Sequence, residues 1–505
     1  MGLFNLDIQV KRMYSCKRIA CLTALLLGLS SCAVGPDYRK PGVADIVPSD
    51  WHWKPAEPCD EIPKGEWWSV FQDPVLSGLE SQAVGANQNL RAAVARVEEA
   101  RASARISRSR FFPEISLDPL IKHERTSGHL PTPIPISIPV GHVDTFSVPF
   151  DLSYEIDLWG KVRRSFEAAQ AQADASVSDY QNVLLTLTAD VAVNYFLVRA
   201  LDGEIGVLST SIRSREDTVR IIEGRFLVGT AQEMDLAQAK RELASARAEL
   251  VDVRRQREET LHALALLCGK PAGEFQLEEA PLNSLPPEIP AGLPSSLLER
   301  RPDIAQAERT LAAKNAQIGV AKAAYFPVLR LTGQAGYLSA EADKLFADPS
   351  RVWSIGPSVS LPIFTAGRIA ADVKRSEAVF EQSLAAYRQS LLIAFKEVED
   401  SLAQVDLRSE QAAAQTLAVE AAARAAELGK ARYEAGSTSY LGFLDADRSR
   451  LEQERRLVQL TGQRFASTVR LIKALGGGWE HGFSAPDKTG SDQRLQRFST
   501  SSVRK

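Results

Sequence analysis

The 505-residue sequence lacks the features that mark several common classes of protein. After its N-terminal leader it has no apolar run of the roughly eighteen residues that a membrane-spanning helix needs, so any membrane crossing must use β-strands or a lipid anchor, or be absent. Its six histidines show no His-x-His or His-Glu-x-x-His spacing, and no Gly-x-x-x-x-Gly-Lys-Ser/Thr loop or nucleophile elbow is present. Basic residues form no patch interleaved with aromatic residues, which argues against nucleic-acid binding. We therefore expect no enzyme activity, no cofactor and no metal site.

Three of the histidines, His123, His129 and His142, lie around one predicted loop. Imidazoles gathered in a loop can bind a transition metal weakly. Solvated loop side chains explain the same pattern, and we favour that interpretation.

Cysteine is also scarce, with five residues in the chain, and its placement indicates the compartment. Basic residues precede the apolar run Ile19–Leu29, which is typical of a secretory signal peptide at residues 1–31, with Met1 or Met13 as the start. The run ends in Leu-Ser-Ser-Cys32, which is similar to the bacterial lipobox and predicts lipidation of Cys32. The next residue is alanine and not aspartate, which favours sorting to the outer membrane.

Only Cys59 and Cys268 remain beyond the predicted anchor. A disulfide between them is possible in an oxidising periplasm, but two cysteines do not make a disulfide framework. We favour two unpaired cysteines.

The chain contains an internal duplication. The run Arg225–Thr230 (RFLVGT) reappears as Arg432–Ser437 (RYEAGS), and the same offset in residue number relates Gly160 to Gly367 and Gly269 to Gly476. An earlier Phe-Pro pair recurs at a larger offset, as Phe112-Pro113 and Phe326-Pro327. A constant offset along such a long part of the chain predicts long elements without insertions. The change of offset must fall between the two landmarks, in a segment that tolerates loops.

Each half changes its hydrophobic period along the chain. Residues 146–158 alternate apolar and other side chains without a miss, the equivalent run 353–363 also alternates, and 115–122 and 328–337 alternate more weakly. These four segments predict four strands, two per half, of the length that a tilted membrane strand needs. The connection 131–140 holds four prolines and is predicted to be a surface loop.

Long helix-forming segments follow each strand pair. No proline occurs in 160–222 or in 366–478, and alanine, leucine, glutamate, glutamine and arginine dominate both. Helices of this length must pack as coiled coils or around a tunnel to bury their apolar stripes. We therefore expect two helical hairpins with tips near 224–236 and 431–445.

Four strands with one apolar face cannot stand alone in a bilayer, because unpaired edge N–H and C=O groups are costly in hydrocarbon. Closed barrels need at least about eight strands, so copies of the chain are expected to share one barrel. The predicted lumen face of 146–158 carries Ser147 and Asp151, opposite Phe146 and Phe150. The alternative, a soluble β-sandwich, has no use for two very long helical hairpins.

The chain resembles the TolC-like outer-membrane efflux proteins, specifically their lipoprotein branch. The stretches that carry the resemblance run through nearly the whole mature chain in the order of the family: residues 67–74 (WWSVFQDP), 154–160 (YEIDLWG), 298–304 (LERRPDI), 323–327 (AAYFP) and 475–479 (LGGGW). The resemblance implies a mainly helical mixed α and β fold, in which hairpins build a periplasmic barrel and four strands per chain contribute to a shared trimeric transmembrane β-barrel. It also implies a homotrimer in outer-membrane lipids that works with a periplasmic adaptor and an inner-membrane RND-type transporter, to export drugs, metals or other small solutes.

The resemblance also implies a gate at the hairpin tips. Leu441 resembles the apolar constriction and Asp445 the acidic ring of relatives, and three copies of Asp445 would form a negative mouth that attracts cations. Tyr433 is expected to hydrogen-bond Asp235 on the neighbouring hairpin. The alternative is that Leu441 packs within its own hairpin and that Asp445 is merely solvated.

This chain departs from some relatives at its second tip. Thr438 stands where a gate-locking basic residue can occur, and Gly442 where a second acid can occur, which predicts a simpler lock. The tip residues expected to dock the adaptor are Arg225, Gly229, Arg432 and Gly436.

The expected organisation is a signal peptide at 1–31, a lipid anchor and extended segment at 32–70, repeats at 71–280 and 295–478, and a disordered tail at 479–505. A passive porin or an exported scaffold would share the barrel, but it would not need hairpin tips that dock an adaptor.

Overall fold

The computed structural model describes residues 33–42, 65–125, 141–282, 284–287 and 301–477. The expected signal peptide at 1–31, the tail at 479–505, and the residues Cys32, Cys59 and His129 lie outside the described residues. The chain divides into two compact units: Met1–Pro41, Val97–Ser176 and Ala307–Tyr387 in the first, and Gly42–Arg96, Val177–Gln306 and Arg388–Lys505 in the second. Each unit combines segments of both sequence halves, so one repeat is not a compact unit by itself. The repeat boundaries 71–280 and 295–478 stay a prediction.

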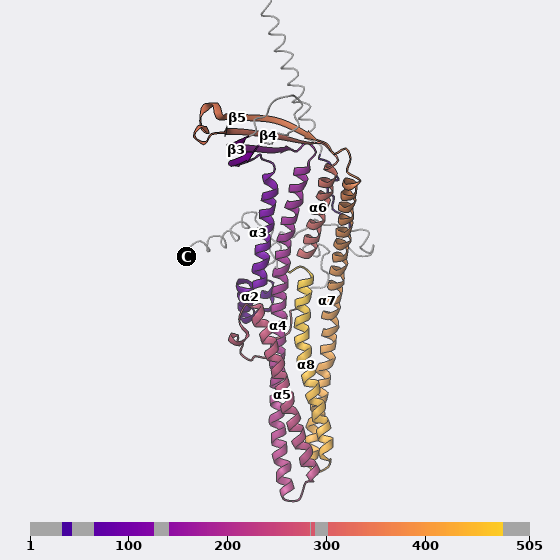
Figure 1. The fold of residues 1–505 in the computed structure, drawn as a ribbon. Helices are drawn as coiled ribbons and strands as arrows, with labels where there is room; N and C mark the ends of the chain where they lie inside the picture. Colours follow the sequence, from indigo (N-terminus) through magenta and orange to yellow (C-terminus); the bar gives the residue numbers. More distant parts are fainter. Residues whose placement is uncertain (1–32, 43–64, 126–140, 283, 288–300, 478–505) are drawn as a thin grey trace, which may run out of the picture. The chain divides into compact units, whose positions relative to one another are not determined.

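The first unit contains an antiparallel sheet (Figure 1). Its strands are β1 (Glu114–Leu117), β2 (Leu120–Arg125), β3 (His142–Ile156), β4 (Val328–Ser339) and β5 (Arg351–Ser360). β1 and β2 pair with successive parts of β3, β3 pairs with β4, and β4 pairs with β5. The four predicted strand positions are therefore present, although the first is split into two strands.

Local chemistry explains where the strands differ from the sequence prediction. Residues 118 and 119 separate β1 from β2, and Pro119 has no N–H to pair in the sheet. β5 ends at Ser360, before the predicted end at 363, and Pro362 follows soon after. β3 ends at Ile156 and not at 158, because the carboxylate of Asp157 accepts hydrogen bonds from the backbone N–H groups of 162 and 163 at the start of the next helix.

Helices account for most of the remaining described chain: α2 (Pro74–Ala86), α3 (Gln88–Ser109), α4 (Lys161–Leu227), α5 (Glu233–Leu267), α6 (Pro302–Ala323), α7 (Arg368–Glu434) and α8 (Tyr440–Ala474), with short 3-10 helices at Trp67–Phe71, Ala272–Glu274, Ala342–Lys344 and Asp348–Ser350. The offset that relates Arg225 to Arg432 also relates both ends of α4 and α5 to those of α7 and α8. The larger offset of the two Phe-Pro pairs relates both ends of α3 to those of α6. The predicted offsets and the two helical hairpins are thereby confirmed.

The two hairpin tips have the same backbone geometry. Gly229 and Gly436 have φ of 78° and 74°, the left-handed region that glycine adopts without strain. In the first tip, the N–H of Thr230 donates to the carbonyl of Arg225, and the N–H of Gly229 donates to that of Phe226. The second tip repeats both bonds at the equivalent positions. Each long helix therefore ends in a Schellman motif, which stops the helix and turns the chain back.

Apolar side chains of α4, α5 and α8 fill the core of the second unit. Phe196 of α4 stacks on Phe465 of α8 with ring centroids 4.5 Å apart, and Phe71 packs against both. Gly462 of α8 lies so close to Ala200 of α4 that a Cβ at Gly462 would stand 2.4 Å from the Ala200 Cβ. The lack of a side chain at Gly462 therefore sets the close approach of α4 and α8.

Among the described residues, one helix is long and apolar enough to meet a composition criterion for a membrane span. It is α4, with an 18-residue window of mean hydropathy 1.4. Because 61% of that window is buried, packing against neighbouring helices accounts for its apolar character.

Candidate functional site

The second hairpin tip places the two expected gate residues on one exposed face of α8. Leu441 and Asp445 are one helical turn apart and therefore project from the same side. The side chain of Leu441 is 51% exposed, and that of Asp445 is 66% exposed. The adjoining side of α8 is buried through Tyr440, Phe443 and Leu444. One side of the helix is thus anchored, and the other is free to face a lumen.

Tyr433 is held by aromatic packing. Its ring lies parallel to that of Phe443 with centroids 6.1 Å apart, and 5.6 Å from that of Tyr440. The guanidinium of Arg225, at the end of α4, lies 5.3 Å from the centre of the same ring, within the range of a cation–π contact. Asp235 lies in the first turn of α5. Within the described part of a single chain, Tyr433 and Asp235 form no hydrogen bond with each other, so their pairing across neighbouring hairpins stays a prediction.

The four expected docking residues mark equivalent positions of the two tips. Arg225 and Arg432 supply the helix-ending carbonyls, while Gly229 and Gly436 adopt the left-handed conformation that turns the chain. The first tip also exposes Leu227 (79%) beside an exposed valine. These groups form an accessible end surface, and their role in docking stays a prediction.

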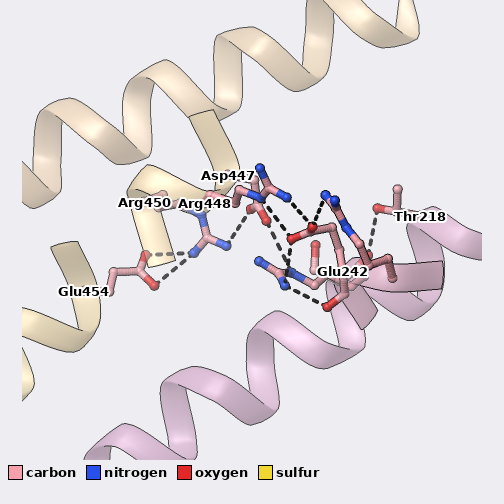
Figure 2. Close-up of polar contacts among 9 residues, drawn as sticks. Thr218, Glu242, Asp447, Arg448, Arg450 and Glu454 are labelled. Carbon is pink, nitrogen blue, oxygen red and sulfur yellow. Dashed lines mark hydrogen bonds and ion pairs between the residues drawn. The ribbon is translucent and has the colours of Figure 1, made fainter. Parts of the chain in front are cut away.

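A network of charged side chains joins the two hairpins a few turns from the tips (Figure 2). Glu242 of α5 accepts hydrogen bonds from Nε (3.0 Å) and Nη2 of Arg448 on α8. Arg215 of α4 donates to the backbone carbonyl of Glu242 (2.9 Å), and its Nε lies 3.7 Å from a carboxylate oxygen of Asp447. Arg450 in turn donates to Asp447 (2.9 Å). The network thus connects three helices of one chain.

Burial makes this network electrostatically strong. The side chain of Glu242 is 8% exposed, and its hydrogen bonds with Arg448, together with nearby Arg241 and Arg215, lower the pKa of Glu242 below its ordinary value. Glu242 was not among the residues predicted from the sequence. The available signal was its position between Ala239 and Ala246 on the buried stripe of α5, where an acid requires a partner.

The first unit holds the chain immediately after the predicted lipidation site. The N–H of Val34 donates to the carbonyl of Trp159 (3.0 Å), just beyond the end of β3. Asp37 accepts a hydrogen bond from the buried Arg164 (2.5 Å), and Asn315 donates to the carbonyl of Pro36 (2.9 Å). The chain that follows Cys32 is therefore fixed near the junction of the sheet with α4.

The two described histidines of the predicted loop region meet on the sheet. The rings of His123 and His142 are stacked with centroids 5.0 Å apart, and His123 is hydrogen-bonded to Asp144 (2.5 Å). All three side chains come from the paired strands β2 and β3. Cys268 is a buried free thiol at the end of α5, and burial raises its pKa to about 11.

Known proteins resemble this chain along almost its whole length. The model of the family "Outer membrane efflux protein" matches residues 79–270 and 293–477. The chain is 36% identical over 470 residues to the pyoverdine export outer membrane protein OpmQ of Pseudomonas aeruginosa, which covers 92% of this chain and 98% of that protein. It is 35% identical over 469 residues to the outer membrane protein OprJ of the same organism, with 92% and 96% covered.

Solved structures show the same fold. The outer-membrane channel OprN aligns with a TM-score of 0.80 and 29% identity, covering 89% of this chain and all of that chain. The CmeC outer membrane channel of Campylobacter jejuni aligns with a TM-score of 0.82 and 26% identity, covering 93% and 98%. This protein, with its two equal hairpins, is an outer-membrane channel of an efflux system, and the chain belongs to the outer membrane efflux protein family.

Proposed function

We propose that this chain forms, as a homotrimer, the exit duct of a tripartite efflux pump. Its partners are a periplasmic adaptor and an inner-membrane RND-type transporter, which supplies the energy while the duct does no chemistry of its own. The observation that carries the proposal is the pair of equal hairpins with matching, exposed tips. Relatives are named for cargoes as different as pyoverdine and toluene. We therefore propose that the transporter chooses the cargo, and that the duct passes drugs, metals or other small solutes.

The sheet supports assembly from several copies. Within the described residues, β1 and β2 pair only with β3, and β5 pairs only with β4, so both sides of the sheet end in unpaired edges. Apolar side chains such as Ile121 (79% exposed) and Trp353 (77% exposed) lie open on the sheet in the described part of one chain. In a bilayer the edges must be paired. Three copies supply about twelve strands, enough to close a barrel and to place these side chains against lipid.

The duplication supports the same assembly in the helices. Within one chain, Ala200 of α4 packs on Gly462 of α8, and Val458 of α8 packs on Gly203 of α4. The repeat positions of Ala200 and Val458 are Leu407 on α7 and Val251 on α5, which are 63% and 65% exposed. A second copy that packs its α5 on α7 of the first would repeat the internal contact and cover both residues.

Lipid anchoring at Cys32 fits the docking of the chain that follows it. Because Val34 is fixed to Trp159 beside the end of β3, an acyl chain on Cys32 would start where the membrane strands end. We propose that Cys32 is acylated after removal of residues 1–31, and that it inserts into the outer membrane. Metabolic labelling with palmitate should label the protein and fail to label the Cys32→Ser variant. Equal labelling of both would contradict the anchor.

We further propose that Leu441 and Asp445 form the closed periplasmic mouth, held by Tyr433 and by Asp235 of the neighbouring hairpin. The exposure of Leu441 and Asp445 on one face of α8 supports this, as does the fixed ring of Tyr433. A ring of apolar side chains narrows a pore, and a ring of acidic side chains gives the pore a negative charge.

Docking of the adaptor is tested by site-specific crosslinking in cells. Leu227→Cys and Glu434→Cys, each in a Cys59→Ser background, place a thiol at the first and second tips. A bifunctional thiol–amine reagent should then capture an adaptor whose gene accompanies a transporter gene. Ser81→Cys, exposed on α2, is the matched control and should capture none. A passive porin would give no adaptor adduct at either tip, which would overturn the tripartite assignment.

A further inference from the structure

Arg448 lies between two carboxylates that have different roles. It donates two hydrogen bonds to Glu242 of the first hairpin, while its Nη1 lies 3.7 Å from Oδ1 of Asp445, one turn away on its own helix. These are its two ion-pair partners among the described residues. The carboxylate of Glu242 is buried, and that of Asp445 is exposed. The guanidinium therefore favours the buried acid, to which it binds through both a terminal and an inner nitrogen.

Glu242 is itself held in place from several sides. Arg241 donates to its Oε1 (2.8 Å), and Arg215 donates to its backbone carbonyl (2.9 Å). Arg215 also lies 3.6 Å from Oε2 of Glu242. The position of Arg448 is consequently set by a rigid acceptor on the other hairpin, and not by a flexible surface contact.

The duplication explains why this acceptor comes from the first hairpin. Arg448 has Arg241 as its repeat mate, and Asp445 has Gln238. The repeat mate of Glu242 is Ser449. The first hairpin thus has an acid at position 242 and none at the position equivalent to Asp445, whereas the second has Asp445 and no acid at the position equivalent to Glu242. The acid that binds Arg448 besides Asp445, among the described residues, therefore comes from the first hairpin.

We propose that Glu242 is a positioning residue for the gate: it holds the guanidinium of Arg448 through two hydrogen bonds, so that Arg448 reaches Asp445 only through a longer contact of 3.7 Å and compensates the negative charge of the mouth only in part. The inference rests on the proposed role of Asp445 at the mouth. Without Glu242, Asp445 is the remaining ion-pair partner of Arg448 among the described residues, and rotation of the arginine side chain would bring the guanidinium closer to it. Glu242 therefore controls cation affinity at the mouth although it is buried and does not line it.

The test measures block of the full-length trimer in planar bilayers by hexamminecobalt(III), a trivalent cation that does not exchange its ligands, added on the side of the tips. Glu242→Gln keeps the shape of the side chain but cannot hold Arg448 as an anion does. We expect the concentration for half-block to rise roughly threefold to tenfold, because a multivalent cation responds steeply to one charge at short range. Arg448→Gln should lower that concentration, since it removes the competing positive charge.

Opposite signs distinguish positioning from a structural role. Loss of packing alone would move both variants in the same direction, whereas the double variant Glu242→Gln/Arg448→Gln should match Arg448→Gln. Glu454→Gln is the matched control, because Glu454 binds Arg450 (2.8 Å) on the same helix and should leave block unchanged.

Each outcome decides the inference. If Asp445→Asn weakens block but Glu242→Gln does not, the mouth stands as proposed and the inference is wrong. If Asp445→Asn itself leaves block unchanged, the proposed mouth is wrong and the inference falls with it. A shift of the two single variants in the same direction would also overturn it.

Discussion

Glu80 is a buried acid whose removal should stabilise the protein. It lies on α2 with a fully buried side chain, and neither of its carboxylate oxygens has a hydrogen-bond partner among the described residues. Burial away from water raises the pKa of Glu80 from 4.5 to about 9. In the folded state the group is therefore protonated at neutral pH, while in the unfolded chain it is ionised.

The sign of the pH dependence follows from proton binding. Between pH 4.5 and about 9 the folded state binds one more proton than the unfolded state, so stability falls as pH rises through this window. Each pH unit costs about 1.4 kcal/mol, so the penalty at pH 7 is about 3 kcal/mol. Glu80→Met removes the titrating group and fills the site with an apolar side chain. It should therefore raise the free energy of unfolding at pH 7 by about 3 kcal/mol.

Thermal unfolding of the detergent-solubilised protein, followed by far-UV circular dichroism from pH 5.5 to 9, measures the effect. The stabilisation by Glu80→Met should grow with pH, and Glu80→Gln should remove the same pH dependence because an amide does not titrate. Glu98→Met, at an exposed position of α3, is the control and should leave the pH dependence intact. If both Glu80 variants keep the pH slope of the unaltered protein, the assignment of a buried protonated acid is refuted.

Three further variants test the packing of the second unit by the same unfolding measurement. Asp202→Ala should lower the free energy of unfolding by about 3–5 kcal/mol, because it leaves the buried Arg199 and Arg257 without the carboxylate that they bind at 3.1 and 2.6 Å. An unchanged melting temperature would contradict this. Gly462→Ala should cost about 1–3 kcal/mol, since its Cβ would stand 2.4 Å from a facing Cβ. Gly206→Ala, which meets open space, should instead stabilise by about 1 kcal/mol, and equal effects would refute the close helix contact.

The helices could be predicted from sequence because their signals are local or periodic. The constant offset between the two repeats requires that both hairpins have equal lengths, and the left-handed glycines Gly229 and Gly436 mark both turns. Strand ends were less predictable. Alternation continues past Ser360 in the sequence, but Pro362 limits hydrogen bonding there, and a capping Asp157 ends β3. Backbone chemistry therefore overrides hydrophobic pattern at these ends.

The site was predictable only in part. Motif position suggested Leu441 and Asp445, and both lie on one exposed face of α8. The partner of Arg448 was not predictable, because Glu242 is distant in the sequence and the two residues meet only when the hairpins pack. The contact of Arg225 with the ring of Tyr433 was missed for the same reason. Pairings between elements distant in sequence require the packed structure.

We propose that the second hairpin tips close the periplasmic end of the outer-membrane duct. Single-channel conductance of the purified trimer in planar bilayers tests this closure. The unaltered channel should conduct weakly, and Tyr433→Phe with Asp445→Ala should raise its conductance, because both the lock and the charged ring are removed. Conductance that is the same in the double variant and in the unaltered channel would contradict the account and remove both residues from the gate.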